Sequence, residues 1–420
     1  MIKKVRVDEL QPGMFIHDLN CGHVFHPLLH TQFHLDDTRA IDRLIERGVS
    51  SVYIDTRLGR DAPDAPTAQE VRDDIDQTLL NMAQRNASAD THPAPLSASD
   101  IDLAHQVYEE ASLTVHELMT TTRLGKHAEL EQVRPAVQGI VDSIFRNADP
   151  LLHLGTIRNA NQYLFYHSVA TCSLLSAFAQ QLGIGRDITR QLAIGAMLHD
   201  IGKTRIAESI LDKPGRLTDA EFDEIKRHVE YGMEILADAP WLTPISLQVV
   251  AQHHERYDGG GYPAALKSDH LSQYGQMAAI VDVYDAITSA RSYHAAMEPV
   301  EAIRKLREWS EQHFNVELVD HFICCVGIYP TGTLVRLESG LLGIVATHNP
   351  ANQLKPAVLV TYDTNRSCRI KPYELDLATQ SGDRIVGYES AEKWGIDPNE
   401  AAYLMAPPGQ SRRIDPAPSC

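Results

Sequence analysis

The 420-residue sequence lacks three features that would each have placed it in a particular class of protein. It has no apolar run approaching the roughly 20 residues that a membrane-spanning helix needs. The start of the chain, MIKKVRVDEL, has no apolar segment of the kind found in signal peptides. The six cysteines form no C-x-x-C pair and follow no regular spacing. We therefore expect a cytoplasmic protein with reduced thiols.

The sequence also has little positive charge. Lys and Arg number 38 against 56 Asp and Glu, for a net charge of −18 at pH 7. Nucleic-acid binding requires a basic face, and anionic membrane surfaces attract basic segments, so the balance disfavours both. An anionic substrate is still compatible with this charge if bound metal ions make the site locally cationic. Histidine is abundant, with 20 residues, and it is the commonest metal ligand.

The hydrophobic patterns predict a multidomain chain whose middle is almost entirely helical. The predicted parts are a small α/β domain at 1–58, a linker at 59–98, a connecting helix at 99–130, an all-α catalytic domain at 131–328, a β-rich module at 329–400 and a disordered tail at 401–420. The linker is expected to be partly helical. Predicted helices of the middle part lie at 131–147, 158–182, 187–201, 218–237, 244–255, 272–290 and 298–312.

The candidate site begins with the adjacent pair His199 and Asp200, at the end of an apolar helix. Imidazole suits Fe, Mn, Zn or Ni, and a carboxylate can bridge two such ions. Gly202 lets the chain leave the helix, and Lys203 places a cation beside the pair. Taken alone, the pair is as compatible with a surface position as with a metal site.

The same helical segment contains further candidate ligands that end or flank helices. These are His167, His228, His253, His254, Asp282 and Asp285. His228 is expected at the half-buried edge of a helix that opens with a capping box at Thr218 and Glu221. Asp282 and Asp285 share one helix face because they lie three residues apart. Each residue alone fits a core histidine or a solvated acid, but together they predict a metal cluster.

These residues resemble the HD-GYP branch of the HD metallophosphohydrolase superfamily. The matching text is His167, HDIGK at 199–203, LDKPGRLT at 211–218, His228, HHERYDGGGYP at 253–263 and DVYDAITSARSY at 282–293. The first ~125 residues resemble an uncharacterised domain often found before HD-GYP domains. The resemblance implies an HD-type helical fold. It also implies hydrolysis of cyclic di-GMP, a bacterial second messenger, to pGpG and then GMP.

The resemblance further implies an Fe or Mn centre with two or three ions. By motif, its ligands would be His167, His199, Asp200, His228, His253, His254 and Asp282, with Asp200 as the bridge. Members with three ions carry a Glu four residues before the first histidine, where this chain has Tyr163. We therefore expect a binuclear centre. A metal-bridging hydroxide would attack phosphorus, with Asp200 and Lys203 as the catalytic residues.

The expected substrate contacts lie around this centre. They are Lys203, Asp258, Gly261, Tyr262, Asp285, Arg291 and His294. Tyr262 would stack on a guanine or bind a phosphate, although the glycine turn before it is also compatible with a purely structural role. Arg291 would bind phosphate with its bidentate fork. Many family members have a basic residue at the position of His294, so phosphate affinity is expected to fall or to depend on pH near a pKa of about 6.5.

Two other functions stay open. The same ligands could serve hydrolysis of another cyclic dinucleotide, such as a mixed GMP–AMP ring, because pocket residues set the base preference. A non-catalytic sensor or partner-binding module is the third possibility, although such proteins are expected to have lost ligands and here all seven are present. The predicted partners are a diguanylate cyclase or other signalling proteins, and a homodimer through the helix at 99–130.

Overall fold

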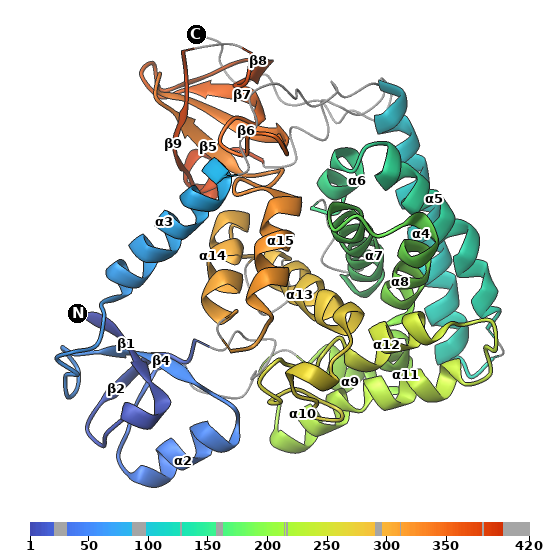
Figure 1. Cartoon of the computed structure of the whole chain (residues 1–420), viewed down its shortest axis with the longest axis horizontal. Helices are drawn as coiled ribbons and strands as arrows, with labels where there is room; N and C mark the ends of the chain where they lie inside the picture. The colour runs from blue at the N-terminus through green and yellow to red at the C-terminus, as the bar shows by residue number, and fades with distance from the viewer. Residues whose placement is uncertain are drawn as a thin grey trace.

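The computed structural model describes residues 1–20, 32–85, 98–126, 128–156, 163–213, 215, 217–289, 296–310, 312–379 and 382–397. They form an N-terminal α/β part, a helical middle and a C-terminal antiparallel sheet (Figure 1), which confirms the predicted fold class. Arg291, His294 and the tail at 401–420 lie outside the described residues, and so does the side chain of Tyr163.

The N-terminal part is a four-stranded antiparallel sheet covered by one helix. Its strands are β1 (Ile2–Arg6), β2 (Phe15–Asp18), β3 (Phe33–His34) and β4 (Ser51–Asp55), in the order β1-β4-β2-β3. Side chains alternate between the faces of a strand. Val52 and Ile54 therefore pack in the core with α2 (Thr38–Glu46), whereas the Tyr53 hydroxyl points to the helical part and donates to Glu308 at 2.7 Å.

The predicted linker contains an 18-residue helix, α3 (Ala68–Arg85). Figure 1 shows α3 running from the N-terminal sheet toward the C-terminal sheet, and it packs on α14 (Pro299–Trp309). Arg304 of α14 pairs with Asp76 of α3 at 2.5 Å, and Arg72 pairs with Glu301. The helix is thus an integral part of the fold that connects all three parts.

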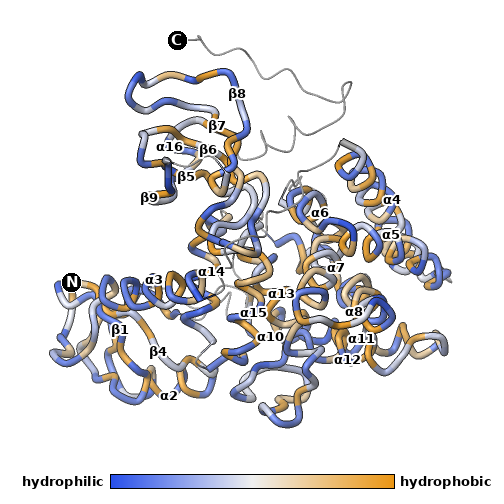
Figure 2. The backbone as a smooth tube through the Cα atoms, turned by 45° about the horizontal axis from the view of Figure 1, so that its top comes forward, coloured by the Kyte–Doolittle hydropathy of each residue, from blue (hydrophilic) through white to orange (hydrophobic). Residues whose placement is uncertain are grey.

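The helical middle is built around one large hydrophobic core. Besides α14, its helices are α4 (Ala98–Arg123), α5 (Val133–Arg146), α6 (Asp149–Leu154), α7 (Tyr163–Gln181), α8 (Arg186–Leu198), α9 (Glu208–Leu211), α10 (Asp219–Lys226), α11 (His228–Leu236), α12 (Pro244–Gln252), α13 (Gln273–Thr288) and α15 (Val316–Val326). Figure 2 shows hydrophobic and hydrophilic stretches alternating along α4 and α5, as expected for helices with one buried face. In the described part of the chain, no helix has the length and apolar character needed to cross a membrane.

The helix predicted over 218–237 is broken into two. Its first half, α10, begins at the predicted capping box of Thr218 and Glu221. Arg227 then separates α10 from α11, which begins at His228. The side chain of His228 is fully buried, so the expectation of a half-buried edge position is wrong. Helices α6 and α15 were not predicted.

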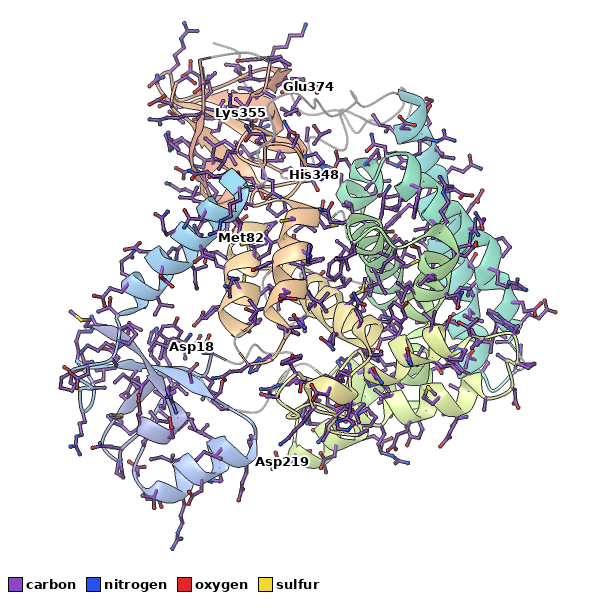
Figure 3. The ribbon with its side chains drawn as sticks, viewed as in Figure 1. Asp18, Met82, Asp219, His348, Lys355 and Glu374 are labelled. Atoms are coloured by element: carbon purple, nitrogen blue, oxygen red, sulfur yellow. The ribbon has the colours of Figure 1, made fainter. Side chains whose placement is uncertain are left out.

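The C-terminal part is a five-stranded antiparallel sheet. Its strands are β5 (Leu334–Leu337), β6 (Leu341–Thr347), β7 (Ala357–Asp363), β8 (Cys368–Asp376) and β9 (Ile385–Tyr388), in the order β8-β7-β6-β5-β9, and α16 (Ala391–Trp394) follows. His348, labelled in Figure 3, contacts Asp149 of α6 and so ties the sheet to the helical part. Cys172, Cys324 and Cys325 are free thiols, but Cys368 is disulfide-bonded, so the expectation of reduced thiols is wrong for that residue.

Candidate metal centre

The seven residues predicted to be ligands meet in the interior of the helical part. They form two groups, one of Asp200, His228, His253 and His254, and one of His167, His199 and Asp282. Within each group, one potential ligand atom of every residue lies within 4.8 Å of the others. All seven side chains are buried except that of His254, which is partly exposed. The structure therefore brings the whole predicted set together from helices α7, α11 and α13 and from the residues that directly follow α8 and α12.

A glycine permits close packing between the segment that follows α8 and the start of helix α11. Helix α8 ends at Leu198, and the chain continues through His199 and Asp200 into the short helix η4 (Ile201–Arg205). A Cβ atom on Gly202 would lie 1.8 Å from the carbonyl oxygen of His228. Only glycine allows η4 to approach the start of α11 so closely. This contact places Asp200 beside His228.

Backbone hydrogen bonds determine which ring nitrogen three of the histidines present to the site. The Nδ1 atoms of His199, His228 and His253 lie 2.6, 2.7 and 2.8 Å from the carbonyl oxygen three residues earlier. A carbonyl oxygen only accepts, so each Nδ1 is the donor, and a neutral imidazole then has an unprotonated Nε2. All three Nε2 atoms point into the cluster, as expected of oriented metal ligands.

The facing lone pairs show that the donor set fits metal ions. His228 Nε2 lies 3.2 Å from His253 Nε2. Burial lowers the pKa of His228 to about 4 and that of His253 to about 3, so both rings are neutral at pH 7. Neither Nε2 has a proton to share, and a cation would remove the repulsion. Among the described residues, the buried Asp200 Oδ1 and Asp282 Oδ2 also have no hydrogen-bond donor.

His167 is oriented by a carboxylate instead of a carbonyl. Its Nδ1 donates to Asp285 Oδ2 at 2.6 Å, and its Nε2 lies 2.9 Å from Asp282 Oδ1. Burial opposes the charged form of His167, but its hydrogen bonds to the two aspartates outweigh burial and raise its pKa. A carboxylate behind a histidine ligand fixes the ring orientation and increases its basicity. In the structure, Asp285 therefore contacts and orients His167, one of the predicted metal ligands.

Asp200 belongs to the first group, but its two oxygens face both groups. Its Oδ1 is 3.4 Å from His228 Nε2, and its Oδ2 is 3.4 Å from His199 Nε2. Burial favours the protonated acid, but Lys203 and the histidines outweigh it and hold the pKa of Asp200 well below its usual range. Asp200 is therefore a carboxylate with one oxygen toward each group. Lys203 Nζ donates to its Oδ2 at 2.6 Å.

A loop at 258–263, the DGGGYP loop, packs beside the cluster. The Tyr262 ring lies 4.7 Å from the His254 ring, centroid to centroid, and the Tyr262 N–H donates to the His254 carbonyl at 3.1 Å. Gly261 has no room for a side chain, because a Cβ would lie 2.4 Å from the Arg256 nitrogen. Asp258 Oδ1 accepts from the Gly260 N–H at 2.8 Å. Of the predicted substrate contacts, Tyr262 thus lies at the cluster, whereas Asp258 binds its own loop.

Comparison with known proteins relates both major parts of the chain to families. Residues 155–318 match the family described as HD domain, and residues 2–133 match a domain of unknown function, DUF3391. The chain is 34% identical over 404 residues to the cyclic di-GMP phosphodiesterase PA4108 of Pseudomonas aeruginosa, and the match covers 94% of each protein. The chain belongs to this HD-domain family.

Two further relatives match shorter stretches. A cyclic di-GMP phosphodiesterase of Vibrio cholerae is 40% identical over 134 residues, which is 30% of this chain and 27% of that protein. The 3'3'-cGAMP-specific phosphodiesterase 2 of the same organism is 36% identical over 143 residues, or 34% of this chain and 27% of that protein. These relatives thus match only part of the chain, unlike PA4108, which also matches the N-terminal part.

Sequence reasoning did not find every residue that shapes this HD-domain site. Asp285 was expected to contact substrate, and its contact with His167 was not foreseen, although its spacing from Asp282 could have suggested a paired role. The steric need for Gly202 was also missed, because it depends on how closely η4 approaches α11. Arg256, whose fully buried guanidinium binds Asp258, gave no signal because arginine is rarely buried.

Proposed function

We propose that this protein is a metal-dependent phosphodiesterase that hydrolyses cyclic di-GMP to pGpG and then to GMP. The observation that carries the proposal is the buried cluster of five histidines and two aspartates, with one oxygen of Asp200 toward each of its two groups. The identity to PA4108, which extends over 94% of both proteins, supports cyclic di-GMP as the substrate.

The donor set is compatible with one divalent ion in each group, and the resemblance to HD-GYP domains favours Fe or Mn. Imidazole suits Fe, carboxylate suits Mn, and neither group contains a thiolate. Asp200 would contact both ions. Two such ions, when bound, lower the pKa of a water molecule and neutralise the charge of a phosphodiester. Metal analysis of protein purified without oxygen is expected to find two ions per chain, and three ions per chain would contradict a binuclear centre.

Residues around the cluster would bind the phosphate and assist the leaving oxygen. Hydrolysis consumes one water, breaks one phosphorus–oxygen bond of the ring and places a proton on the leaving oxygen. Lys203 has a 19% exposed side chain, and its ammonium would stabilise a phosphate oxygen or assist the leaving oxygen. Tyr262 would contact a guanine or a phosphate from its position beside His254. Arg291 and His294 stay predicted phosphate contacts.

Replacement of the bridging carboxylate tests the metal-dependent reaction. Asp200→Asn is expected to lose metal and to slow pGpG formation roughly 1000-fold, because the amide cannot neutralise two cations. Asp187→Asn is the matched control, since Asp187 lies in the first turn of α8, the helix that leads to His199, and its side chain is 91% exposed. Wild-type turnover by metal-free Asp200→Asn protein would overturn the proposal.

Replacement of Lys203 separates its role from metal binding. Lys203→Met is expected to retain both ions and to slow turnover about 100-fold, because one charged donor to the phosphate is lost. Lys226→Met is the control, because Lys226 lies on the surface of α10 and pairs with Asp223. Chromatography of the products gives the turnover rate, and metal analysis of the same samples gives the number of bound ions. Unchanged turnover in Lys203→Met would remove Lys203 from the mechanism.

A second candidate substrate is a mixed GMP–AMP ring. The observation in its favour is the 36% identity to the cGAMP-specific relative over a third of this chain. Parallel hydrolysis assays with the two cyclic dinucleotides, on one metal-loaded preparation, decide between them. We expect a higher kcat/KM with cyclic di-GMP, because PA4108 matches over far more of the chain. Binding of either compound without turnover would instead favour a sensor.

A further inference from the structure

The DGGGYP loop is held by two charged residues that directly precede it. Glu255 accepts from the backbone N–H groups of Ala264 and Leu266, at 2.7 and 3.0 Å. Arg256 is only 2% exposed, and its Nη2 donates to Asp258 Oδ2 at 2.6 Å. The same Nη2 donates to the carbonyl oxygen of Gly48 at 3.1 Å. A single buried guanidinium therefore joins the loop to the N-terminal part of the chain.

Gly48 has the backbone conformation and the space that this contact requires. It follows α2 with a φ of +70°, which favours glycine. A Cβ on Gly48 would lie 3.5 Å from Arg256 Nη1 and 3.9 Å from the Gly260 Cα, so Gly48 lies next to both the guanidinium and the loop. The neighbouring Arg47 pairs with Asp219 at 3.2 Å. Figure 3 labels Asp219 on α10, near the end of α2.

The path from this contact to the metal cluster is short. Tyr262 belongs to the same loop, and its ring packs on His254, with a second ring contact to His228 at 6.4 Å. Both histidines belong to one of the two candidate metal groups. A buried guanidinium that lost one acceptor would carry an uncompensated desolvation cost. The positions of Gly48 and of the loop are therefore energetically coupled.

We propose that Arg256 is a positioning residue through which the N-terminal part sets the place of Tyr262 beside the metal cluster. Movement of α2 and Gly48 would release the guanidinium, loosen the loop and withdraw Tyr262 from His254. The kinetic consequence rests on the proposed phosphodiesterase function. The structural consequence is loosening of the loop. It does not depend on the phosphodiesterase function and can be measured independently.

The first test is Arg256→Lys in the metal-loaded full-length protein. Lysine keeps the charge, but its tetrahedral ammonium on a flexible stem does not present two N–H donors in the fixed plane that Arg256 Nη2 offers to Asp258 and Gly48. We expect kcat/KM for cyclic di-GMP to fall about tenfold, the size of one lost hydrogen bond to a charged group. Metal content should stay unchanged, and amide hydrogen exchange over residues 255–266 should become faster.

Tyr53→Phe is the matched control for loosening the interface in general. Tyr53 also reaches from the N-terminal sheet to the helical part, where it donates to Glu308, and Glu308 keeps its contacts with Lys305 and Lys4. This variant should leave both kcat/KM and loop exchange at wild-type values. If it accelerates loop exchange as much as Arg256→Lys does, the specific role of Arg256 is overturned.

Gly48→Ala alters the same contact at its acceptor, the Gly48 carbonyl. It tests the role of the contact if the Arg256→Lys protein does not fold. Alanine is strained at a φ of +70°, so the carbonyl should shift and the loop should again exchange faster. Wild-type exchange over 255–266 in this variant or in Arg256→Lys would overturn the inference. If the wild-type protein binds metal but does not hydrolyse cyclic di-GMP, the proposed function fails, and the exchange measurements alone decide the role of Arg256.

Discussion

His228 Nε2 and His253 Nε2 lie 3.2 Å apart in the protein interior, although both rings already donate their Nδ1 proton to a backbone carbonyl. Two unprotonated nitrogens at this distance repel each other. A third group relieves the repulsion only if it accepts both lone pairs, and a cation between them does so. The protein without metal therefore carries an energetic cost at this site.

Metal removal should accordingly lower stability as well as activity. A metal present at 1000 times its Kd adds about 4 kcal/mol to the free energy of unfolding, and chelation should remove this amount. Thermal unfolding followed by circular dichroism, before and after chelation, measures the change. Added Mn²⁺ or Fe²⁺ should restore the original midpoint. An unchanged midpoint in protein shown to have lost its metal would contradict the prediction.

Asp285→Asn distinguishes a residue that orients His167 from one that binds substrate. Asparagine can still accept from His167 Nδ1, but it removes the negative charge 2.6 Å away. We expect metal affinity to fall about 10- to 100-fold, as for other groups behind a histidine ligand. Titration of metal into apoprotein gives the affinity. If instead only the KM for substrate rises, Asp285 acts as the substrate contact that the sequence suggested.

Gly202→Ala should destabilise the protein and disturb the cluster together. The added Cβ would lie 1.8 Å from the His228 carbonyl oxygen, so η4 and α11 must move apart. We expect a loss of about 3 kcal/mol in the free energy of unfolding, typical of overpacking, with reduced metal content. Gly185→Ala, at the N-cap of α8 with φ −65° and nothing within 4 Å, should lower stability by no more than about 1 kcal/mol, the N-cap preference for Gly over Ala. Equal denaturation midpoints for the two variants would contradict this account.

The candidate ligands could be predicted from the sequence because their residue types carry the chemistry. Several ligands can be recognised by their residue type and by their position at helix ends, namely His199, Asp200, His253 and His254. Only the fold shows the partners behind them, since Asp285 is 118 residues from His167 along the chain. The same holds for Gly202, whose close neighbour His228 belongs to another helix.

The helix boundaries were less predictable than the helices. The apolar positions of 218–237 continue in register across Arg227, so periodicity alone predicts one helix where the chain forms two. The predicted β-rich module at 329–400 contains the strands β5 to β9, and β9, Ile385–Tyr388, has a glycine that weakens its strand pattern. Contacts between distant segments, such as Arg256 with Gly48, leave no local pattern to read.

His153 offers a test of pH dependence that is separate from the metal site. Its side chain is 1% exposed in α6, and neither ring nitrogen has a hydrogen-bond partner among the described residues. Burial lowers its pKa to about 4, against about 6.5 in an unfolded chain. Between these values the unfolded state binds the extra proton, so stability falls as pH falls from about 6.5 to about 4.

His153→Met should therefore make stability less sensitive to acid. Methionine is apolar and adapts to irregular space, so at pH 8 the variant should be at least as stable as the wild type. On going from pH 8 to pH 5, the wild type should lose about 2 kcal/mol more than the variant, the linkage expected for a pKa shift from 6.5 to 4. Urea unfolding of both proteins at the two pH values, with the same metal loading, measures this difference. Equal losses in the two proteins would show that His153 does not become protonated on unfolding in this range.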